Sequence, residues 1–317
     1  MLFGKCVVTG GAGFIGSNLT RRLVDLAKEV VVIDNLSTGQ IANLKDGINF
    51  VYGDIRDLEL LKKVLNDTEI VFHLAALPSV KRSVEDPVST NANNVQGTLN
   101  VLVAAKERYV DRVIFASSSS VYGNSDELPK HEDMTPKPIS PYAVSKLAGE
   151  QYAKAFYDIY GLKTVILRYF CIFGPMQSPN SEYSAVIPKF IKKMLNDERP
   201  EIYGDGNQTR DFTYVDNVVE ANILATKSEK AIGQVINIGS GEQHSLNELF
   251  SILSSLLGKN LRPIYHEFRK GDVRHSRASI KEARELLGYN VVIPFEVGLK
   301  KTIEYILSGR KEKTNNT

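Results

Sequence analysis

The sequence predicts an α/β protein in which a doubly wound parallel sheet carries a smaller, interleaved α+β domain. Two observations favour this fold class. In the first half of the chain, short segments rich in valine and isoleucine alternate with stretches of helical periodicity. Most of these segments are apolar on both faces, as strands of a parallel sheet are when helices cover both of its sides. After Leu167 the alternation stops, and a turn-rich segment, residues 173–180, begins a region of mixed helices and short strands.

The predicted elements follow from these patterns. The strands are Lys5–Val8, Glu29–Asp34, Asn49–Tyr52, Ile70–Leu74, Arg112–Ala116, Lys163–Leu167, Glu201–Tyr203 and Gln234–Ile238. The helices are Gly16–Leu26, Asp57–Leu65, Val95–Arg108, Pro141–Tyr160, Ala185–Leu195, Ser245–Leu256, Ile280–Leu287 and Phe295–Leu307. We assign residues 1–170 and about 211–238 to the sheet domain, about 171–210 and 239–308 to the second domain, and 309–317 to a disordered tail. This division predicts a cleft at the carboxyl ends of the strands.

The composition argues against several classes of protein. A net charge of +2 over 317 residues leaves no basic field for nucleic acid, and no apolar run is long enough to cross a bilayer. The first strand begins within a few residues of Met1, so we expect no signal peptide. Two distant cysteines, Cys6 and Cys171, make neither a disulfide framework nor a zinc site. We therefore expect a cytoplasmic protein that has no metal and binds neither nucleic acid nor membrane.

The first strand ends in a loop with glycine at every third position, at Gly10, Gly13 and Gly16. In a dinucleotide site the first glycine permits the tight turn, the second the close approach of a pyrophosphate, and the third close packing of helix and strand. The helix that follows directs unpaired N–H groups and its positive dipole end at the phosphates. The pattern predicts a Rossmann dinucleotide site, and the alternative is a glycine-rich turn without a ligand.

The second strand ends in an acidic residue, Asp34, at the spacing expected of such a site. A carboxylate at this place accepts hydrogen bonds from the ribose hydroxyls and repels a 2′-phosphate. The sequence therefore predicts NAD rather than NADP as the cofactor.

A tyrosine and a lysine four residues apart, Tyr142 and Lys146, follow Pro141 at a predicted helix start and share one helix face. A phenol has a pKa of about 10, and a neighbouring ammonium together with an oxidised nicotinamide would lower it. Alone, the pair is more often a surface pair. The serine run 117–120 favours chemistry, because it follows a buried strand at its carboxyl end, where its hydroxyls can align a reacting oxygen with Tyr142.

Taken together, these motifs resemble those of the NAD-dependent sugar-nucleotide epimerase/dehydratase family of extended short-chain dehydrogenases/reductases, most closely its UDP-hexose 4-epimerases. The similarity runs from about Lys5 to Leu307. Further matching motifs are Gly53-Asp54-Ile55, His73-Leu-Ala-Ala76, Leu167-Arg-Tyr-Phe170, Thr209-Arg-Asp-Phe212 and Arg269-Lys-Gly-Asp272.

The resemblance implies three sets of site residues. The catalytic set is Tyr142, Lys146 and Ser118. The NAD-binding set is Gly10, Gly13, Phe14, Ile15, Gly16, Asp34, Asn35, Ser37, Thr38, Gly39, Asp54, Ile55, Leu74, Ala75, Ala76, Asn94, Ser117, Tyr142, Lys146 and Phe170. The set for a UDP-sugar substrate is Pro78, Ser118, Ser119, Tyr142, Cys171, Ala185, Val186, Tyr203, Arg210, Arg269, Asp272 and Ser276, in which the two arginines would hold the diphosphate.

The serine run also separates branches of the family. Related dehydratases carry Asp-Glu at the positions of Ser119 and Ser120, and decarboxylases carry Glu at that of Ser120, whereas this chain has neither acid. The remaining chemistry is epimerisation: Tyr142 takes the C4 hydroxyl proton as hydride passes to NAD, and the 4-keto sugar turns and receives hydride on its other face. Ser276 is small where a tyrosine favours UDP-glucose, so we expect UDP-GlcNAc/UDP-GalNAc and UDP-Glc/UDP-Gal as substrates.

Two departures from the family pattern leave alternatives open. Cys171 stands where Asn is usual and is either a packing residue or a sugar contact. Met176 replaces a common Arg, which disfavours a carboxylated sugar, although a UDP-glucuronate 4-epimerase is the runner-up. A non-catalytic NAD-binding regulator and a sugar-nucleotide reductase are further alternatives. Relatives dimerise through two helices, so we expect a homodimer through Val95–Arg108 and Pro141–Tyr160.

Overall fold

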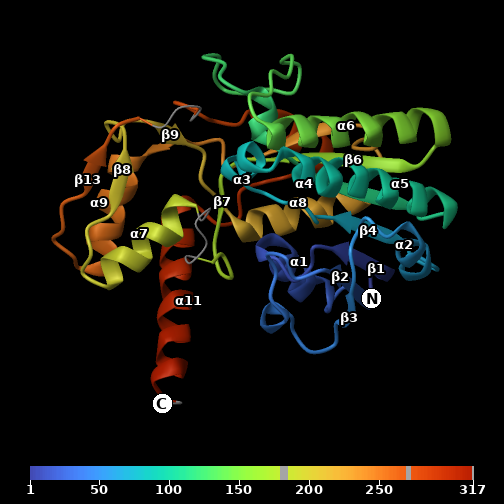
Figure 1. Ribbon diagram of the computed structural model, residues 1–317, viewed down its shortest axis with the longest axis horizontal. Helices are drawn as coiled ribbons and strands as arrows, with labels where there is room; N and C mark the ends of the chain where they lie inside the picture. The colour runs from blue at the N-terminus through green and yellow to red at the C-terminus, as the bar shows by residue number, and fades with distance from the viewer. Residues whose placement is uncertain (179–184, 269–272, 316–317) are drawn as a thin grey trace.

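The computed structural model describes residues 1–178, 185–268 and 273–315, and it contains a seven-stranded sheet whose strands are all parallel (Figure 1). The strand order is β11-β6-β5-β4-β1-β2-β3. The strands are β1 (Phe3–Thr9), β2 (Ala27–Asp34), β3 (Asn49–Tyr52), β4 (Ile70–His73), β5 (Arg112–Ser118), β6 (Lys163–Tyr169) and β11 (Val235–Ile238). The order reverses between β1 and β4, where a doubly wound sheet opens a crevice at its carboxyl edge. The predicted fold class is confirmed.

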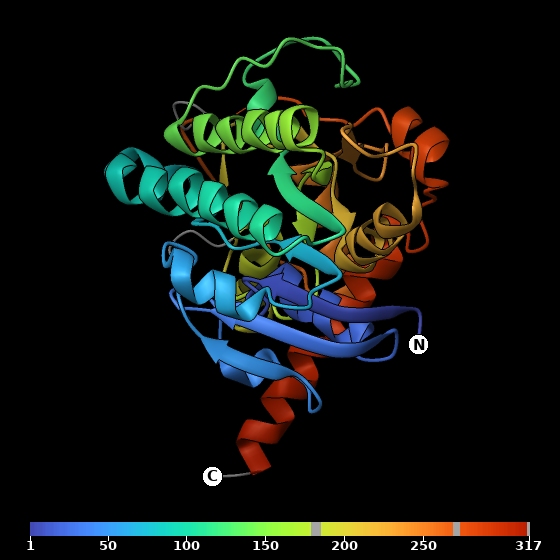
Figure 2. The same ribbon diagram turned by 90° about the vertical axis from the view of Figure 1, so that its right-hand side faces the viewer.

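Helices cover both faces of the sheet (Figure 2). One layer contains α1 (Phe14–Leu23), α8 (Val215–Lys227) and α10 (Lys281–Leu287), and the other contains α2 (Leu58–Val64), α5 (Gly97–Glu107) and α6 (Pro141–Tyr160). Side chains alternate between the layers as a strand requires: Val8 of β1 packs toward α1 and α8, whereas Val7 packs toward α2 and α5. Two-sided burial explains the continuous apolar character of these strands.

The second domain lies at one end of the sheet and has its own core (Figure 1). Its elements are α7 (Val186–Leu195), β8 (Glu201–Tyr203), α9 (Leu246–Leu257), β13 (Ile264–His266) and α11 (Phe295–Asn315). Phe190, Leu249 and Phe295 are among the residues buried in this core. Among the described residues, three small ladders pair its segments. β7 (Ile172–Phe173) pairs with β10 (Thr213–Tyr214), β9 (Thr209–Arg210) pairs with β12 (His244–Ser245), and β8 pairs with β13.

Several elements differ from the prediction. The helix α8 was not predicted, because two buried polar residues, Asn217 and Asn222, interrupt its apolar pattern. The predicted helix at Val95–Arg108 is preceded by α3 (Val80–Glu85), α4 (Pro87–Asn91) and a π-helical turn, Ala92–Gln96. Short 3-10 turns also occur at Ile41–Asn43 and Ser119–Tyr122.

The last helix extends into the segment that we expect to be a disordered tail, residues 309–317. The helix α11 continues to Asn315, past the predicted end at Leu307. Arginine, lysine and glutamate dominate residues 310–313, and these are strong helix formers, so a polar composition alone does not end a helix. Within the described residues, no helix is long and apolar enough to cross a membrane, and no three His, Cys, Asp or Glu side chains gather as a metal site.

Candidate active site

The glycine loop after β1 has the geometry that a bound pyrophosphate requires. Gly10 has a φ of +71°, and a Cβ at this position would lie 2.7 Å from the backbone of Ala75. A Cβ on Gly16 would lie 2.7 Å from the Gly11 Cα and would clash with the Gly10 carbonyl oxygen. Gly13 is the N-cap of α1, and no side chain caps this helix end. The first-turn N–H groups are thus available to an anion in the cavity beside them, so these residues fit the pyrophosphate of NAD.

A cavity extends from this loop along the carboxyl ends of the neighbouring strands. The predicted residues in its wall are Gly10, Gly13, Phe14, Ile15, Gly16, Asp34, Asn35, Ser37, Thr38, Ile55, Leu74, Ala75, Ala76, Pro78, Ser117, Tyr142 and Lys146. The wall also contains Ile33, Gly53, Asn93, Ala116 and Tyr169, which were not predicted. Each of these five directly precedes a predicted residue in the chain. The sequence therefore locates the segments, whereas the backbone decides which neighbour faces the cavity.

Asp34 is buried at the end of β2, beside the glycine loop. Its Oδ2 accepts a hydrogen bond from the Ala12 N–H at 3.0 Å, and its Oδ1 accepts one from the Leu36 N–H at 2.8 Å. Burial raises the pKa of Asp34, and these two N–H donors oppose that shift. A carboxylate has about four acceptor positions, so acceptor capacity remains for ribose hydroxyls.

Four predicted cofactor residues, Gly39, Asp54, Asn94 and Phe170, lie outside the described wall of this cavity. Asp54 accepts two hydrogen bonds from the Arg56 guanidinium, at 2.9 and 2.8 Å, and these lower the pKa of Asp54 to about 2. Phe170 is buried in the core beside the sheet. Asn94 is also buried, and its side-chain amide forms hydrogen bonds with Leu77 and Ser145.

The predicted catalytic residues meet where α6 begins, at the carboxyl end of β5. The Lys146 Nζ donates a hydrogen bond to the Ala116 carbonyl oxygen at 2.9 Å. Burial lowers the pKa of Lys146 to about 8, and the Glu150 carboxylate opposes this shift. Burial raises the pKa of Tyr142, and a hydrogen bond with Ser118 opposes this rise. The phenol, the ammonium and the Ser118 hydroxyl are therefore brought together as predicted.

A buried ion pair beneath these residues was not predicted. Glu150 accepts hydrogen bonds from Arg168 Nε at 2.9 Å and Nη2 at 2.7 Å, and both side chains are almost fully buried. The Ser117 hydroxyl also donates to Glu150, so the ion pair holds the first serine of the run. Glu150 lies one turn after Lys146 on the same face of α6, and this spacing was a signal in the sequence.

A second cavity lies on the other domain and contains five of the predicted substrate residues, Cys171, Ala185, Val186, Tyr203 and Arg210. It also contains Ile172, Phe173, Ile187, Lys189, Phe190, Lys193, Glu201, Gln208, Phe212 and Leu246, which were not predicted. The Tyr203 ring stacks on His266 with centroids 5.0 Å apart. Cys171 is half-buried, and its side chain also packs against the core of this domain.

Three predicted substrate residues lie outside both cavity walls as described. Ser118 ends β5, and Ser119 begins the 3-10 turn after it. Ser276 lies beside β9, where its N–H donates to the Thr209 carbonyl oxygen at 3.1 Å, so it neighbours Arg210. Arg269 and Asp272 fall outside the described residues.

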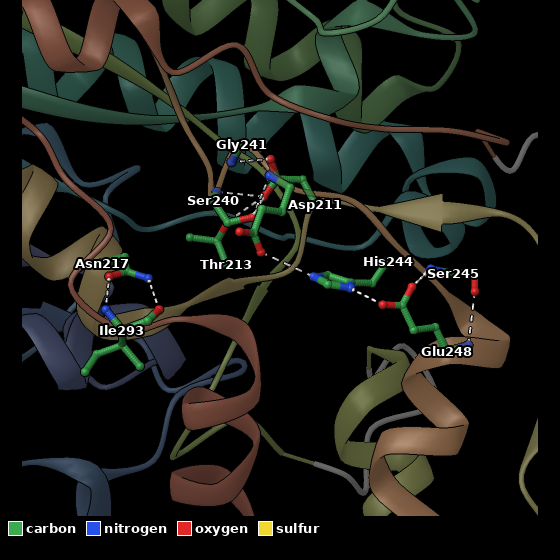
Figure 3. Close-up of polar contacts among 10 residues, drawn as sticks. Asp211, Thr213, Asn217, Ser240, Gly241, His244, Ser245, Glu248 and Ile293 are labelled. Atoms are coloured by element: carbon green, nitrogen blue, oxygen red, sulfur yellow. Dashed lines mark hydrogen bonds and ion pairs between the residues drawn. The ribbon is translucent and has the colours of Figure 1, made fainter.

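A buried carboxylate anchors the strand that carries Arg210 (Figure 3). Asp211 accepts hydrogen bonds from the Ser240 N–H and hydroxyl, both at 2.7 Å, and from the Gly241 N–H at 3.0 Å. The Thr213 hydroxyl and the Ala278 N–H donate to it as well, each at 3.0 Å. Burial raises the pKa of Asp211, and these donors oppose that shift. The network joins three separate segments of the chain around β9.

Comparisons with known proteins agree with this geometry. A model of the NAD dependent epimerase/dehydratase family matches residues 6–239. A putative UDP-glucose 4-epimerase of Methanocaldococcus jannaschii is 40% identical, over 96% of this chain and 99% of its own. A solved UDP-N-acetylglucosamine 4-epimerase of Methanobrevibacter ruminantium, in complex with UDP-N-acetylmuramic acid, is 42% identical with a TM-score of 0.94, over 98% of this chain and 100% of its own. A solved UDP-glucuronic acid 4-epimerase of Bacillus cereus, with UDP-glucuronic acid and NAD, is 36% identical with a TM-score of 0.89, over 96% and 99%. The chain therefore belongs to the NAD-dependent epimerase/dehydratase family.

Proposed function

We propose that this member of the family is a UDP-sugar 4-epimerase that interconverts UDP-GlcNAc with UDP-GalNAc and UDP-Glc with UDP-Gal. The observation that carries the proposal is the meeting of Tyr142, Lys146 and Ser118 at the carboxyl end of β5, beside the cavity that begins at the glycine loop. The serine run there has no carboxylate of its own, so the site lacks the acids that related dehydratases and decarboxylases use. Relatives named as 4-epimerases match this chain over almost their whole length, which supports the same branch of the family.

In the proposed mechanism, Tyr142 alone transfers the proton of the sugar C4 hydroxyl. The glycine loop and Asp34 would hold NAD, which would supply a reversible hydride acceptor for C4 of the sugar. Tyr142 takes the proton of the C4 hydroxyl and later gives it back, and Ser118 holds the reacting oxygen in line with the phenol. Because burial raises the pKa of Tyr142, a nearby positive charge has to stabilise the phenolate, and the Lys146 ammonium supplies it.

The proposed substrate range depends on the second domain. Arg210 on β9 would grip the diphosphate, and Tyr203 would stack on the uracil. Ser276, next to β9, leaves room beside the sugar 2-position for an N-acetyl group. Arg269 and Asp272, outside the described residues, complete the predicted set. UDP-glucuronate is the second candidate substrate, because relatives named for it are 35% and 36% identical.

We also propose a cytoplasmic homodimer that packs through α5 and α6. The outward side of α6 carries apolar residues, and Val144 and Ile159 are 53% and 70% exposed. Burial of such residues against a second copy would remove apolar surface from water. Light scattering should give twice the mass of one chain, and a monomer at micromolar concentration would contradict this arrangement.

Replacement of the catalytic phenol tests the proposed function. Tyr142→Phe should lower turnover of a UDP-sugar by roughly 10²–10⁴-fold, because it removes the acid and base, while binding of NAD and UDP-sugar stays near wild type. Tyr109→Phe is the matched control, since Tyr109 is 92% exposed and lies outside both described cavity walls and outside α5 and α6. Full activity in the Tyr142 variant would reject the assignment.

A further inference from the structure

A series of buried hydrogen bonds, which we call the relay, begins in the loop after β4 and crosses the domain. The Ala75 N–H donates to Thr9 Oγ1 at 3.2 Å, and Thr9 Oγ1 lies 2.7 Å from Nδ1 of His73. On the other side of the ring, His73 Nε2 lies 2.9 Å from Thr98 Oγ1. The Thr98 hydroxyl donates in turn to the Asn94 carbonyl oxygen at 2.6 Å. These hydrogen bonds thus join β1, β4 and the segment that contains α5.

The relay continues from Asn94 to α6, the helix that carries Tyr142. The Asn94 Oδ1 accepts from the Leu77 N–H at 2.8 Å, and its Nδ2 donates to the Leu77 carbonyl oxygen at 3.2 Å. The Nδ2 also donates to Ser145 Oγ at 3.0 Å, and that hydroxyl donates to the Tyr142 carbonyl oxygen at 2.7 Å. Cofactor loop residues 74–77 are therefore tied to the turn of α6 that carries Tyr142.

The direction of every bond follows from the donors available. The Thr98 proton is used on the Asn94 carbonyl oxygen, so Thr98 Oγ1 accepts from His73 Nε2–H. His73 Nδ1 then accepts from the Thr9 hydroxyl, which itself accepts from the Ala75 N–H. The ring is neutral in this scheme, and burial, helped by the Lys146 charge, lowers the pKa of His73 to about 3. No donor of the relay is left over, and a second proton on the ring would break it.

A π-helical turn brings the middle of the relay into place. Asn93 and Asn94 lie within this turn, Ala92–Gln96, and an extra residue in a helical turn shifts the side chains that follow it. Asn93 lines the cofactor cavity, whereas Asn94 is buried at 2% exposure and bonds to Leu77 and Ser145. Adjacent side chains thus serve the cavity wall and the relay behind it.

We propose that His73 and Thr98 are positioning residues that hold the cofactor loop in register with the turn carrying Tyr142. The inference rests on the proposed function, because its consequence is the placement of NAD against the catalytic phenol. His73 and Thr98 are 1% and 2% exposed and are not among the residues that line the described cofactor cavity, so they act through Ala75, Leu77 and Asn94. Loss of the relay would loosen the loop and the phenol together.

Two substitutions of Thr98 separate the hydroxyl from the shape of the side chain. Thr98→Val keeps the shape and removes the hydroxyl, which leaves His73 Nε2–H and the Asn94 carbonyl oxygen unpaired. We expect the NAD dissociation constant to rise about tenfold and kcat to fall about tenfold, with KM for the UDP-sugar within about twofold of wild type. Thr98→Ser keeps the hydroxyl and should return both values to within about threefold of wild type. Calorimetric titration of NAD into cofactor-stripped protein gives a readout that needs no turnover.

A matched control is present in the same domain. Thr68 is also buried, and its hydroxyl has no hydrogen-bond partner among the described residues, so Thr68→Val should leave NAD affinity and kcat unchanged. If Thr98→Val lowers only the melting temperature, with both constants at wild-type values, the residue is merely structural and the proposal is wrong. If Thr98→Val fails to fold, Ser145→Ala tests the last bond of the relay, and an unchanged kcat there overturns the proposal. If NAD binding weakens as expected but wild type converts no UDP-sugar, the relay stands and the proposed function fails.

Discussion

The two halves of the site are built in different ways. The cofactor half consists of residues at the carboxyl ends of successive parallel strands: Gly10 follows β1, Asp34 ends β2, Leu74 follows β4 and Ser117 lies at the end of β5. The proposed substrate half consists of Cys171, Tyr203, Arg210 and Ser276. These residues come from segments far apart in the chain, which short two-stranded ladders and the Asp211 network bring together. The first half thus depends on the sheet, whereas the second depends on a few buried polar anchors.

The largest expected effect falls on the cofactor half. Gly16→Ala should abolish NAD binding, because a Cβ there clashes with the backbone of the Gly10–Gly11 turn. Cofactor content, measured by absorbance after release from purified protein, checks this result. Gly309→Ala is the control, since a Cβ there meets nothing within 4 Å, and it should leave NAD bound. Retention of NAD by the Gly16 variant would contradict the close approach of α1 to its loop.

The anchor of the substrate half should affect the substrate rather than the cofactor. Asp211→Asn replaces one carboxylate oxygen by an amide NH2, which faces the N–H groups that Asp211 now satisfies. We expect KM for the UDP-sugar to rise tenfold or more, because Arg210 loses its support, with NAD still bound. Asp205→Asn, at an exposed turn, is the control. An equal loss of NAD would show that the two halves are not separable.

A substitution beside β9 sharpens the comparison further. Ser276→Tyr adds a ring beside β9 and should suppress turnover of UDP-GlcNAc while it spares UDP-Glc. Parallel assays of both substrates give the ratio of kcat/KM values, which we expect to shift by about tenfold or more. Equal loss on both substrates would place Ser276 away from the sugar 2-position.

A further expected effect falls on stability rather than on activity: the stability of the cofactor half should depend on pH. Because the pKa of His73 is lowered to about 3 from a usual value near 6.5, the unfolded chain binds a proton between these values that the folded chain rejects. This residue therefore destabilises the fold as pH falls from 6.5 toward 3, by roughly 2 kcal/mol at pH 5. Denaturant unfolding at pH 7 and pH 5 should show a smaller difference in His73→Asn than in wild type. An identical pH slope in both would mean that His73 is not the group responsible.

The same contrast explains what the sequence could predict. The seven sheet strands, the helix Pro141–Tyr160 and most of the cofactor cavity follow from periodicity and from the rule that parallel strands present ligand sites at their carboxyl ends. The helix α8 was missed because its buried Asn217 and Asn222 interrupt the apolar pattern. Tertiary partners stabilise both side chains: the Ile293 carbonyl oxygen accepts from Asn217, and the Tyr169 hydroxyl accepts from Asn222, which also donates to the Val218 carbonyl oxygen of its own helix. Arg210 and Ser276 were proposed as site residues through the resemblance alone, since no local pattern indicates which distant segments will pair. The placement of Asn94 in a relay rather than in the cavity depends on a π turn that propensity does not predict.

The measurement that tests the central claim most directly is proton NMR of the purified protein with a UDP-sugar and no added cofactor. UDP-GlcNAc, UDP-Glc and UDP-glucuronate are incubated separately, and the anomeric signals are followed over time. We expect the C4 epimers of UDP-GlcNAc and UDP-Glc to appear although no NAD is added. Turnover of UDP-glucuronate alone would contradict the proposed substrates, and no turnover of any of the three, even after NAD is added, would contradict the epimerase itself.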